Sequence, residues 1–239
     1  FRLKDRFNTL VQGTALFDCL VGNFYSSGFH AIYPALEHTN NIRILIGIST
    51  SGDTLRLIQE GNRSIQKEIK ISHSETKEII EDAVKIEMET SSDSRNVEEG
   101  VHKFIEWARS GKLIIKAYPS QNIHAKLYIM TFKEGSIDKG RVITGSSNFT
   151  KSGLEDNLEF NVELKNSGDY EFAKEKFDEL WEDAVDVSDK YIETIEDKTW
   201  FSDKVTPYNL YLKFLYEYFK TELNETGELY IDHTPEGFK

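Results

Sequence analysis

The sequence has almost none of the features that hold a protein together covalently or place it in a membrane. Its 239 residues include one cysteine, Cys19, which excludes an internal disulfide and a cysteine-rich zinc site. A chain of this length can bury a sizeable core without such supports. No apolar run approaches the ~20 residues of a membrane span, and the opening residues FRLKDRF do not form a secretion signal. We therefore expect a cytoplasmic α/β protein without membrane contact.

The net charge of −12 is distributed unevenly. Residues 112–153 hold seven Lys or Arg against two acids, whereas residues 155–203 hold seventeen acids against five bases. Phosphate affinity depends on a local basic surface and not on the sum over the molecule. The basic stretch is therefore compatible with a phosphate-bearing partner, although an ordinary solvated face gives the same asymmetry.

Apolar spacing predicts alternating helices and strands. Residues 4–22 carry apolar side chains at helical intervals and are predicted as a helix. The run IRILIGIST indicates a strand buried on both faces, and a helix over 53–61 should follow it. We expect strands near 42–48, 113–118, 123–130, 141–145 and 158–164. The pattern is that of a mixed, mostly parallel sheet flanked by helices on both faces.

Helical patterns dominate the remainder of the chain. Residues 64–97 are interpreted as exposed helices, and VEEGVHKFIEWARSG as a helix closed by Gly111. We expect one α/β domain over residues 1–168, and over 169–239 a helical extension leading to a further domain. The acid-rich part of that extension has no metal-binding loop pattern, which favours a solvated helix face. The aromatic stripe of TPYNLYLKFLYEYF favours packing over a base-stacking platform.

One group of residues carries recognisable chemistry: His124, Lys126, Gly145, Ser146, Asn148 and Glu159. In HAKLYIM, the two-residue period of a strand places His124, Lys126 and Tyr128 on one face. In LEFNVEL, the same period places Glu159 on the face opposite the apolar residues. The segment GSSNFTKSG between these strands is predicted as a turn of small hydrogen-bonding residues, where Gly145 permits close backbone approach to a ligand.

These residue types suit a phosphodiester. Charge on the nonbridging oxygens of a transferring phosphoryl group requires cationic and neutral donors, which Lys126, Ser146 and Asn148 supply. His124 can attack phosphorus as free imidazole or protonate a leaving oxygen as imidazolium. Glu159 can orient His124 by accepting from its second ring nitrogen. Because side chains supply all the charge, no metal or other cofactor is required.

HAKLYIMT, followed by GSSNFT and NLE, resembles the HxK(x)4D…GSxN motif of the phospholipase D superfamily. The resemblance implies a phosphohistidine intermediate, with His124 as nucleophile or acid, and Glu159 orienting it. Lys126, Ser146, Ser147 and Asn148 would bind phosphate. The position of the motif aspartate is occupied by Thr131 here. Asp138 in the nearby loop could replace the missing acid, but it is interpreted as a solvated residue of the turn. The other histidines, His30, His38, His73, His102 and His233, have no comparable context and are predicted to be structural or exposed.

The leading functional hypothesis is a nuclease domain acting on DNA in preference to RNA. The chain resembles the amino-terminal phospholipase D-like domain of some bacterial helicases, which implies a helicase domain in the same full-length protein. A non-catalytic DNA-binding or dimerisation module is the alternative, favoured by Thr131, and a phospholipase is a third. In-line displacement needs two histidines on opposite sides of phosphorus. Since the chain supplies one HxK motif, we expect a homodimer with a shared site.

Overall fold

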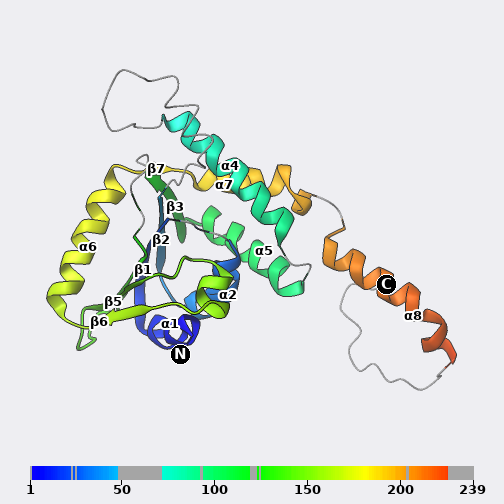
Figure 1. Ribbon diagram of the computed structural model, residues 1–239, viewed down its shortest axis with the longest axis horizontal. Helices are drawn as coiled ribbons and strands as arrows, with labels where there is room; N and C mark the ends of the chain where they lie inside the picture. Colours follow the sequence, from blue (N-terminus) through cyan, green and yellow to red (C-terminus); the bar gives the residue numbers. More distant parts are fainter. Residues whose placement is uncertain are drawn as a thin grey trace.

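The centre of the protein is a seven-stranded sheet (Figure 1). The computed structural model describes residues 2–22, 24, 26–47, 72–91, 94–118, 123, 125–202 and 205–225. The helix expected over 53–61 and His233 lie outside these residues. The strands are β1 (Thr14–Val21), β2 (Asn41–Gly47), β3 (Leu113–Tyr118), β4 (Leu127–Phe132), β5 (Gly140–Gly145), β6 (Asn161–Leu164) and β7 (Val185–Asp186). Of the predicted strands, the three that became β2, β3 and β5 are placed within one residue, whereas β4 and β6 begin later than expected.

The strand order β6-β5-β4-β1-β2-β3-β7 makes a mixed sheet, which confirms the expected α/β class. Parallel pairing is confined to β1 with β2 and β2 with β3, whereas the other four neighbouring pairs are antiparallel. The sheet is therefore less parallel than predicted. The reason lies in the connections: helices cross over between β1, β2 and β3, but a short hairpin links β4 to β5, and a short hairpin joins only antiparallel strands.

The N-terminal segment is not the single helix that its spacing predicted. Helix α1 (Leu3–Leu10) is followed by a 3₁₀ turn (Val11–Gly13), and the chain then enters β1. Along β1, Phe17 and Cys19 face one hydrophobic core while Leu20 faces the other. A strand covered on both faces is apolar at nearly every position, so its sequence also satisfies a helical pattern.

The larger core lies between one face of the sheet and a layer of helices. Besides α1, this layer contains α2 (Ser26–Leu36), α4 (His73–Thr90), α5 (Arg95–Arg109) and α7 (Ser188–Lys198). Helix α4 is not simply exposed, as residues 64–97 were expected to be, because Ile80, Val84 and Met88 are buried in this core. Helix α5 ends as predicted before Gly111, which has a φ of +75°.

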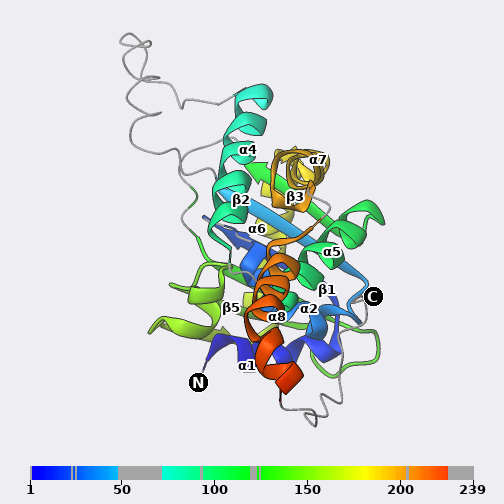
Figure 2. The same cartoon turned by 90° about the vertical axis from the view of Figure 1, so that its right-hand side faces the viewer.

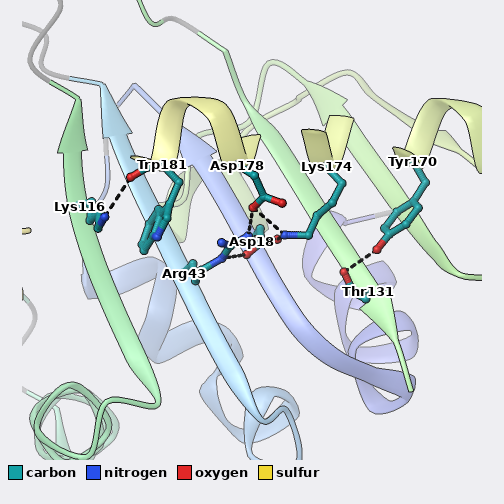
Figure 3. Close-up of polar contacts among 8 residues, drawn as sticks. All are labelled: Asp18, Arg43, Lys116, Thr131, Tyr170, Lys174, Asp178 and Trp181. Carbon is teal, nitrogen blue, oxygen red and sulfur yellow. Dashed lines mark hydrogen bonds and ion pairs between the residues drawn. The ribbon is translucent and has the colours of Figure 1, made fainter. Parts of the chain in front are cut away.

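Helix α6 (Ser167–Glu182) covers the opposite face of the sheet, where its Tyr170, Ala173 and Phe177 form the second core. Asp18, Arg43, Lys174 and Asp178 form a cluster of charges within this layer (Figure 3). Asp18 of β1 is fully buried and binds Arg43 of β2 through two contacts of 2.6 and 2.9 Å. Lys174 of α6 lies 3.0 Å from Asp18, and Asp178 lies 2.6 Å from Arg43. Opposite charges therefore connect α6 to the two central strands.

Part of the expected extension belongs to the packed body. Helix α6 covers the sheet, β7 pairs with β3, and α7 packs into the larger core. Helix α8 (Pro207–Glu225) instead extends away from the sheet, and in Figure 2 it lies in front of the body. Its Tyr211, Phe214 and Tyr218 are exposed, so the predicted packing of the aromatic stripe is not met within the described residues. No helix in the described part of the chain combines the length and the apolar character needed to cross a membrane.

Candidate functional site

Three strand ends meet where the predicted site lies. Leu20, near the end of β1, is opposite Leu127 at the start of β4, and Leu127 is opposite Thr144 near the end of β5. Lys126 directly precedes β4, and its carbonyl oxygen accepts from Thr144 Oγ1 at 3.0 Å and from the Gly145 N–H at 3.4 Å. The sheet therefore brings Lys126 to the beginning of the GSSN turn (residues 145–148), which lies 19 residues later in the sequence.

His124, the predicted nucleophile, lies outside the described residues. Its neighbour Ile123 passes over the end of β2: a Cβ added to Gly47 would lie 2.5 Å from the Ile123 carbonyl oxygen. A larger residue at position 47 would displace the chain that leads to the HxK motif. The expected pairing of His124 with Glu159 stays a prediction.

Two side chains, the buried Tyr128 and the partly buried Asn161, hold the GSSN turn in place. The Tyr128 hydroxyl donates to the Ser147 carbonyl oxygen at 2.7 Å, and Asn161 Nδ2 donates to Ser147 Oγ at 2.8 Å. Burial raises the pKa of Tyr128 well above its ordinary value, so the hydroxyl remains a donor. Tyr128 is thus a core residue rather than an exposed neighbour of Lys126. Ser147 is buried and bonded within the protein, in contrast to the phosphate-binding position predicted for it.

Ser146 and Glu159 lie together at the surface. The Ser146 hydroxyl donates to the Glu159 carboxylate and accepts from the Phe160 N–H at 3.0 Å. The Ser146 N–H in turn donates to the Phe160 carbonyl oxygen at 3.1 Å. A Cβ at Gly145 would lie 2.1 Å from that same carbonyl oxygen, so the glycine permits the approach of the chain before β6. The predicted close approach occurs, but its partner is protein backbone.

The Asn148 side chain contains a buried polar atom that has no partner in the described chain. Its carboxamide oxygen is buried and has no hydrogen-bond partner among the described residues. The Asn148 carboxamide therefore has hydrogen-bonding capacity that the described residues do not use.

Thr131 lies away from this cluster (Figure 3). It is five residues beyond Lys126, which is about 16 Å along a strand, and its hydroxyl contacts the Tyr170 hydroxyl of α6 at 2.8 Å. Thr131, which occupies the position of the motif aspartate, therefore helps to hold α6 against the sheet. Asp138 forms an ion pair with Arg141 in the hairpin.

The sequence analysis did not single out Glu87, and it predicted His30 to be structural or exposed; both lie on the helical side of the turn. Glu87 of α4 is buried, and His30 of α2 has two buried ring nitrogens without a hydrogen-bond partner in the described chain. A signal existed for Glu87, because it falls on the apolar stripe formed by Ile80, Val84 and Met88. Among the described residues, no group of three or more His, Cys, Asp or Glu side chains is placed to hold a metal ion.

Comparisons with known proteins agree with the motif. The family model described as "Cardiolipin synthase, PLD-like domain" matches residues 26–181. No curated protein matches the chain. Solved structures that resemble it include Nuc, a phospholipase D family member from Salmonella typhimurium, at 15% identity and a TM-score of 0.39, covering 77% of this chain and 89% of that one.

NucT from Helicobacter pylori resembles it at 13% identity and a TM-score of 0.37, covering 76% of this chain and 89% of NucT. TrmBL2, an archaeal chromatin protein with a novel mode of DNA binding, does so at 15% identity and a TM-score of 0.38, covering 77% of this chain and 51% of TrmBL2. The family match spans more than half of the sequence and includes the HxK motif, the GSSN turn and Glu159. The chain therefore belongs to the phospholipase D-like domain family.

Proposed function

We propose that the protein is a phosphodiesterase of the phospholipase D type that cleaves DNA through a phosphohistidine intermediate on His124. The observation that carries this proposal is the meeting of Lys126, the GSSN turn and Glu159 at one end of the sheet. Residues separated by 20 to 33 positions in the sequence are brought together in the order that the motif requires.

The proposal gives each residue of the motif a role. A ring nitrogen of His124 attacks phosphorus, so that a P–N bond forms as the P–O bond to the leaving oxygen breaks. Lys126 and Asn148 stabilise the charge on the nonbridging oxygens. Water then displaces the histidine, which restores free imidazole. Glu159 orients this chemistry through Ser146 or through His124 directly, and Tyr128 positions the turn.

Nucleic acid is the substrate class that the charge distribution favours. The basic stretch 112–153 includes Lys126 and the turn, and it contains Lys116, Lys133, Lys139, Arg141 and Lys151. A phosphate backbone requires such local basic residues. The helicase domain expected in the full-length protein rests on the sequence resemblance alone.

We further propose that two copies share one site. The residues next to Ser146 and Glu159 present an unusual apolar surface, because Leu158 is fully exposed and the exposed fraction of Phe160 is 78%. Both precede β6, which is an edge strand of the sheet. A twofold contact over this surface would bury these side chains and bring a second His124 to protonate the leaving oxygen.

The central experiment measures cleavage of plasmid and oligonucleotide DNA in EDTA. We expect cleavage by the wild-type protein and none by His124→Ala. Lys126→Ala and Asn148→Ala should each lose at least about a hundredfold in rate, the scale for removing one aimed donor. Glu159→Gln should lose less, because it only orients. Lys176→Ala, which removes an exposed charge from α6 outside the basic stretch, is the matched control and should retain activity.

Two results would contradict the proposal. Activity that disappears in EDTA and returns with magnesium indicates a different mechanism. DNA binding that survives without cleavage in the dimer indicates the non-catalytic module instead.

A further inference from the structure

A cavity of about 550 Å³ lies on the helical side of the GSSN turn. Its walls are the first turns of α2 and α5, the C-terminal part of α4, and residues 151–155, which closely follow the turn. None of the residues assigned to phosphodiester chemistry above lines it. Its volume is in the range of small-molecule sites.

Glu87 lies at the base of this cavity. It is buried, and its Oε1 accepts from Ser26 Oγ at 2.6 Å and from the Ser27 N–H at 3.1 Å. Burial raises the pKa of Glu87 to about 7, despite these hydrogen bonds. Near neutral pH the carboxyl group is therefore available both as a proton donor and as an acceptor.

His30 adds a second polar group to the cavity and lies on α2, one helical turn after Ser26. Both ring nitrogens are buried and unbonded within the described chain, and burial lowers the pKa of the imidazole to about 4. The neutral ring offers one donor and one acceptor. It packs against Gly100 of α5, where a Cβ would lie 2.6 Å from the ring. A glycine inside a helix is costly, and here it makes room for the imidazole.

The rim of the cavity is close to the proposed cleavage site. Lys151 lies on the rim, its side chain is exposed, and its backbone N–H donates to Ser27 Oγ at 3.4 Å. Lys151 is three residues from Asn148, so their Cα atoms are at most about 11 Å apart. That span corresponds to roughly three nucleotides along one DNA strand. A DNA strand held at the turn can therefore reach the cavity.

We propose that this cavity receives one unpaired nucleobase of the DNA strand whose phosphodiester lies at the turn. The inference rests on the proposed function. A base edge carries adjacent donors and acceptors that Glu87, His30 and Asn96 can match, while Ala31 and Val97 can contact the ring face. An acyl chain would leave the ring nitrogens of His30 unpaired, and an inorganic anion that met Lys4 and Lys151 would also face the carboxyl groups of Glu87 and Glu155.

The experiment measures affinity for single-stranded oligonucleotides by fluorescence anisotropy. It is carried out in the His124→Ala background, so that cleavage does not interfere. A single abasic site is moved along the oligonucleotide, one position at a time. We expect one position, near the cut made by the wild-type protein, where loss of the base weakens binding about tenfold, the scale of one bound base.

Two variants test whether that base occupies the cavity. Glu87→Gln preserves size and the acceptor for Ser26, and His30→Phe preserves the ring against Gly100. Each should weaken binding of the intact oligonucleotide about fivefold to tenfold while leaving binding of the critical abasic oligonucleotide unchanged. Glu106→Gln, which removes an exposed acid paired with Lys103 elsewhere on α5, is the control and should change neither.

The outcomes separate the two proposals. Equal binding of all abasic oligonucleotides, or an equal loss by the variants on intact and abasic DNA, overturns the inference while leaving the nuclease proposal in place. A free mononucleotide that binds tightly in a Glu87-dependent manner, with no effect of abasic sites, also overturns it and assigns the cavity to a soluble nucleotide. Failure of the wild-type protein to bind or cleave DNA overturns the proposed function itself.

Discussion

Tyr128 connects the interior of the protein to the candidate site. Its ring packs against Phe7 with centroids 4.9 Å apart, while its hydroxyl holds the Ser147 carbonyl oxygen. Removing a hydroxyl from a buried pair leaves the other partner unsatisfied, which costs more than an exposed hydrogen bond contributes. Loss of this hydroxyl should therefore affect both stability and the GSSN turn, which we propose binds phosphate.

We predict that Tyr128→Phe lowers the free energy of unfolding by about 1–2 kcal/mol and slows DNA cleavage several-fold. Tyr170→Phe is the matched control, because it removes a hydroxyl contact to Thr131 at the far end of β4. It should lower stability to a similar extent without slowing cleavage of DNA. Urea denaturation and cleavage assays measure both effects. Equal cleavage rates for the two variants would show that the Tyr128 hydroxyl does not contribute to cleavage.

Glu87 makes stability depend on pH in a direction that is unusual for a carboxyl group. Its pKa is about 7 in the folded protein, against an ordinary value of 4.5. Between these values the folded state binds more protons than the unfolded state, so stability decreases as pH rises from about 4.5 to 7. His30, with its lowered pKa, acts oppositely and loses stability as pH falls from 6.5 to about 4.

Glu87→Gln isolates the carboxyl contribution, because glutamine does not titrate. Relative to wild type, the variant should gain stability as pH rises from 4.5 to 7, by up to about 3 kcal/mol. The charged groups Lys4, Lys151 and Glu155 also line the cavity and remain the same in both proteins. Urea denaturation at several pH values provides the measurement. A difference between the two proteins that does not vary with pH would show that Glu87 has an ordinary pKa.

At the scale of elements, a cluster of charged side chains joins α6 to the two central strands. Asp18 has no exposed surface and contacts both Arg43 and Lys174, whereas the side chain of Asp178 is 44% exposed. The aromatic rings of Phe177 and Trp181 lie 4.9 and 5.2 Å from the Arg43 guanidinium and restrict its access to water. Loss of the buried carboxylate leaves two cations without adequate compensation.

Asp18→Asn should therefore lower the free energy of unfolding by about 3–5 kcal/mol. Asp178→Asn, which removes the same charge from a partly solvated position, should cost about 1 kcal/mol or less. Guanidinium denaturation would screen these charges, so urea is the suitable denaturant. Equal losses for the two variants would mean that burial of Asp18 does not determine its contribution.

At the scale of the whole molecule, assembly determines whether one HxK motif is sufficient. Phe160→Glu places a charge on the apolar surface before β6, and we predict a dimer dissociation constant at least about tenfold higher, with cleavage lost in parallel. Phe172→Glu is the control, because Phe172 is also exposed but lies on α6. Sedimentation velocity measures the association. A Phe160→Glu monomer that cleaves at the full rate would defeat the shared site.

Mixing subunits provides an independent check of the same prediction. Excess His124→Ala protein should suppress wild-type activity in proportion to the loss of wild-type homodimer, because each shared site needs both histidines. Activity proportional to the wild-type subunits alone would indicate one complete site per chain.

Local pattern was enough to predict the parts of this protein that depend on neighbouring residues. The isoleucine-rich run predicted β2, alternation predicted β3 and β5, and Gly111 marked the end of α5. The order of HAK, GSSN and Glu159 predicted the family. Each of these strands and helix ends is contained in a short segment, so its energetics are largely independent of the rest of the chain, and the family was recognised from the order of three short motifs.

Long-range contacts decided the rest. Residues 14–21 form a strand because the central position in the sheet covers both of their faces, a fact that helical spacing cannot express. Ser147 faces inward because Tyr128 and Asn161 reach it from two other strands. Glu87 and His30 share a cavity because Glu87 of α4 accepts hydrogen bonds from Ser26 and Ser27 at the start of α2, although 57 residues separate Glu87 from His30 in the sequence. The sequence by itself thus determined which chemistry is present, and only tertiary packing decided which polar groups are buried, because burial depends on residues distant in the chain.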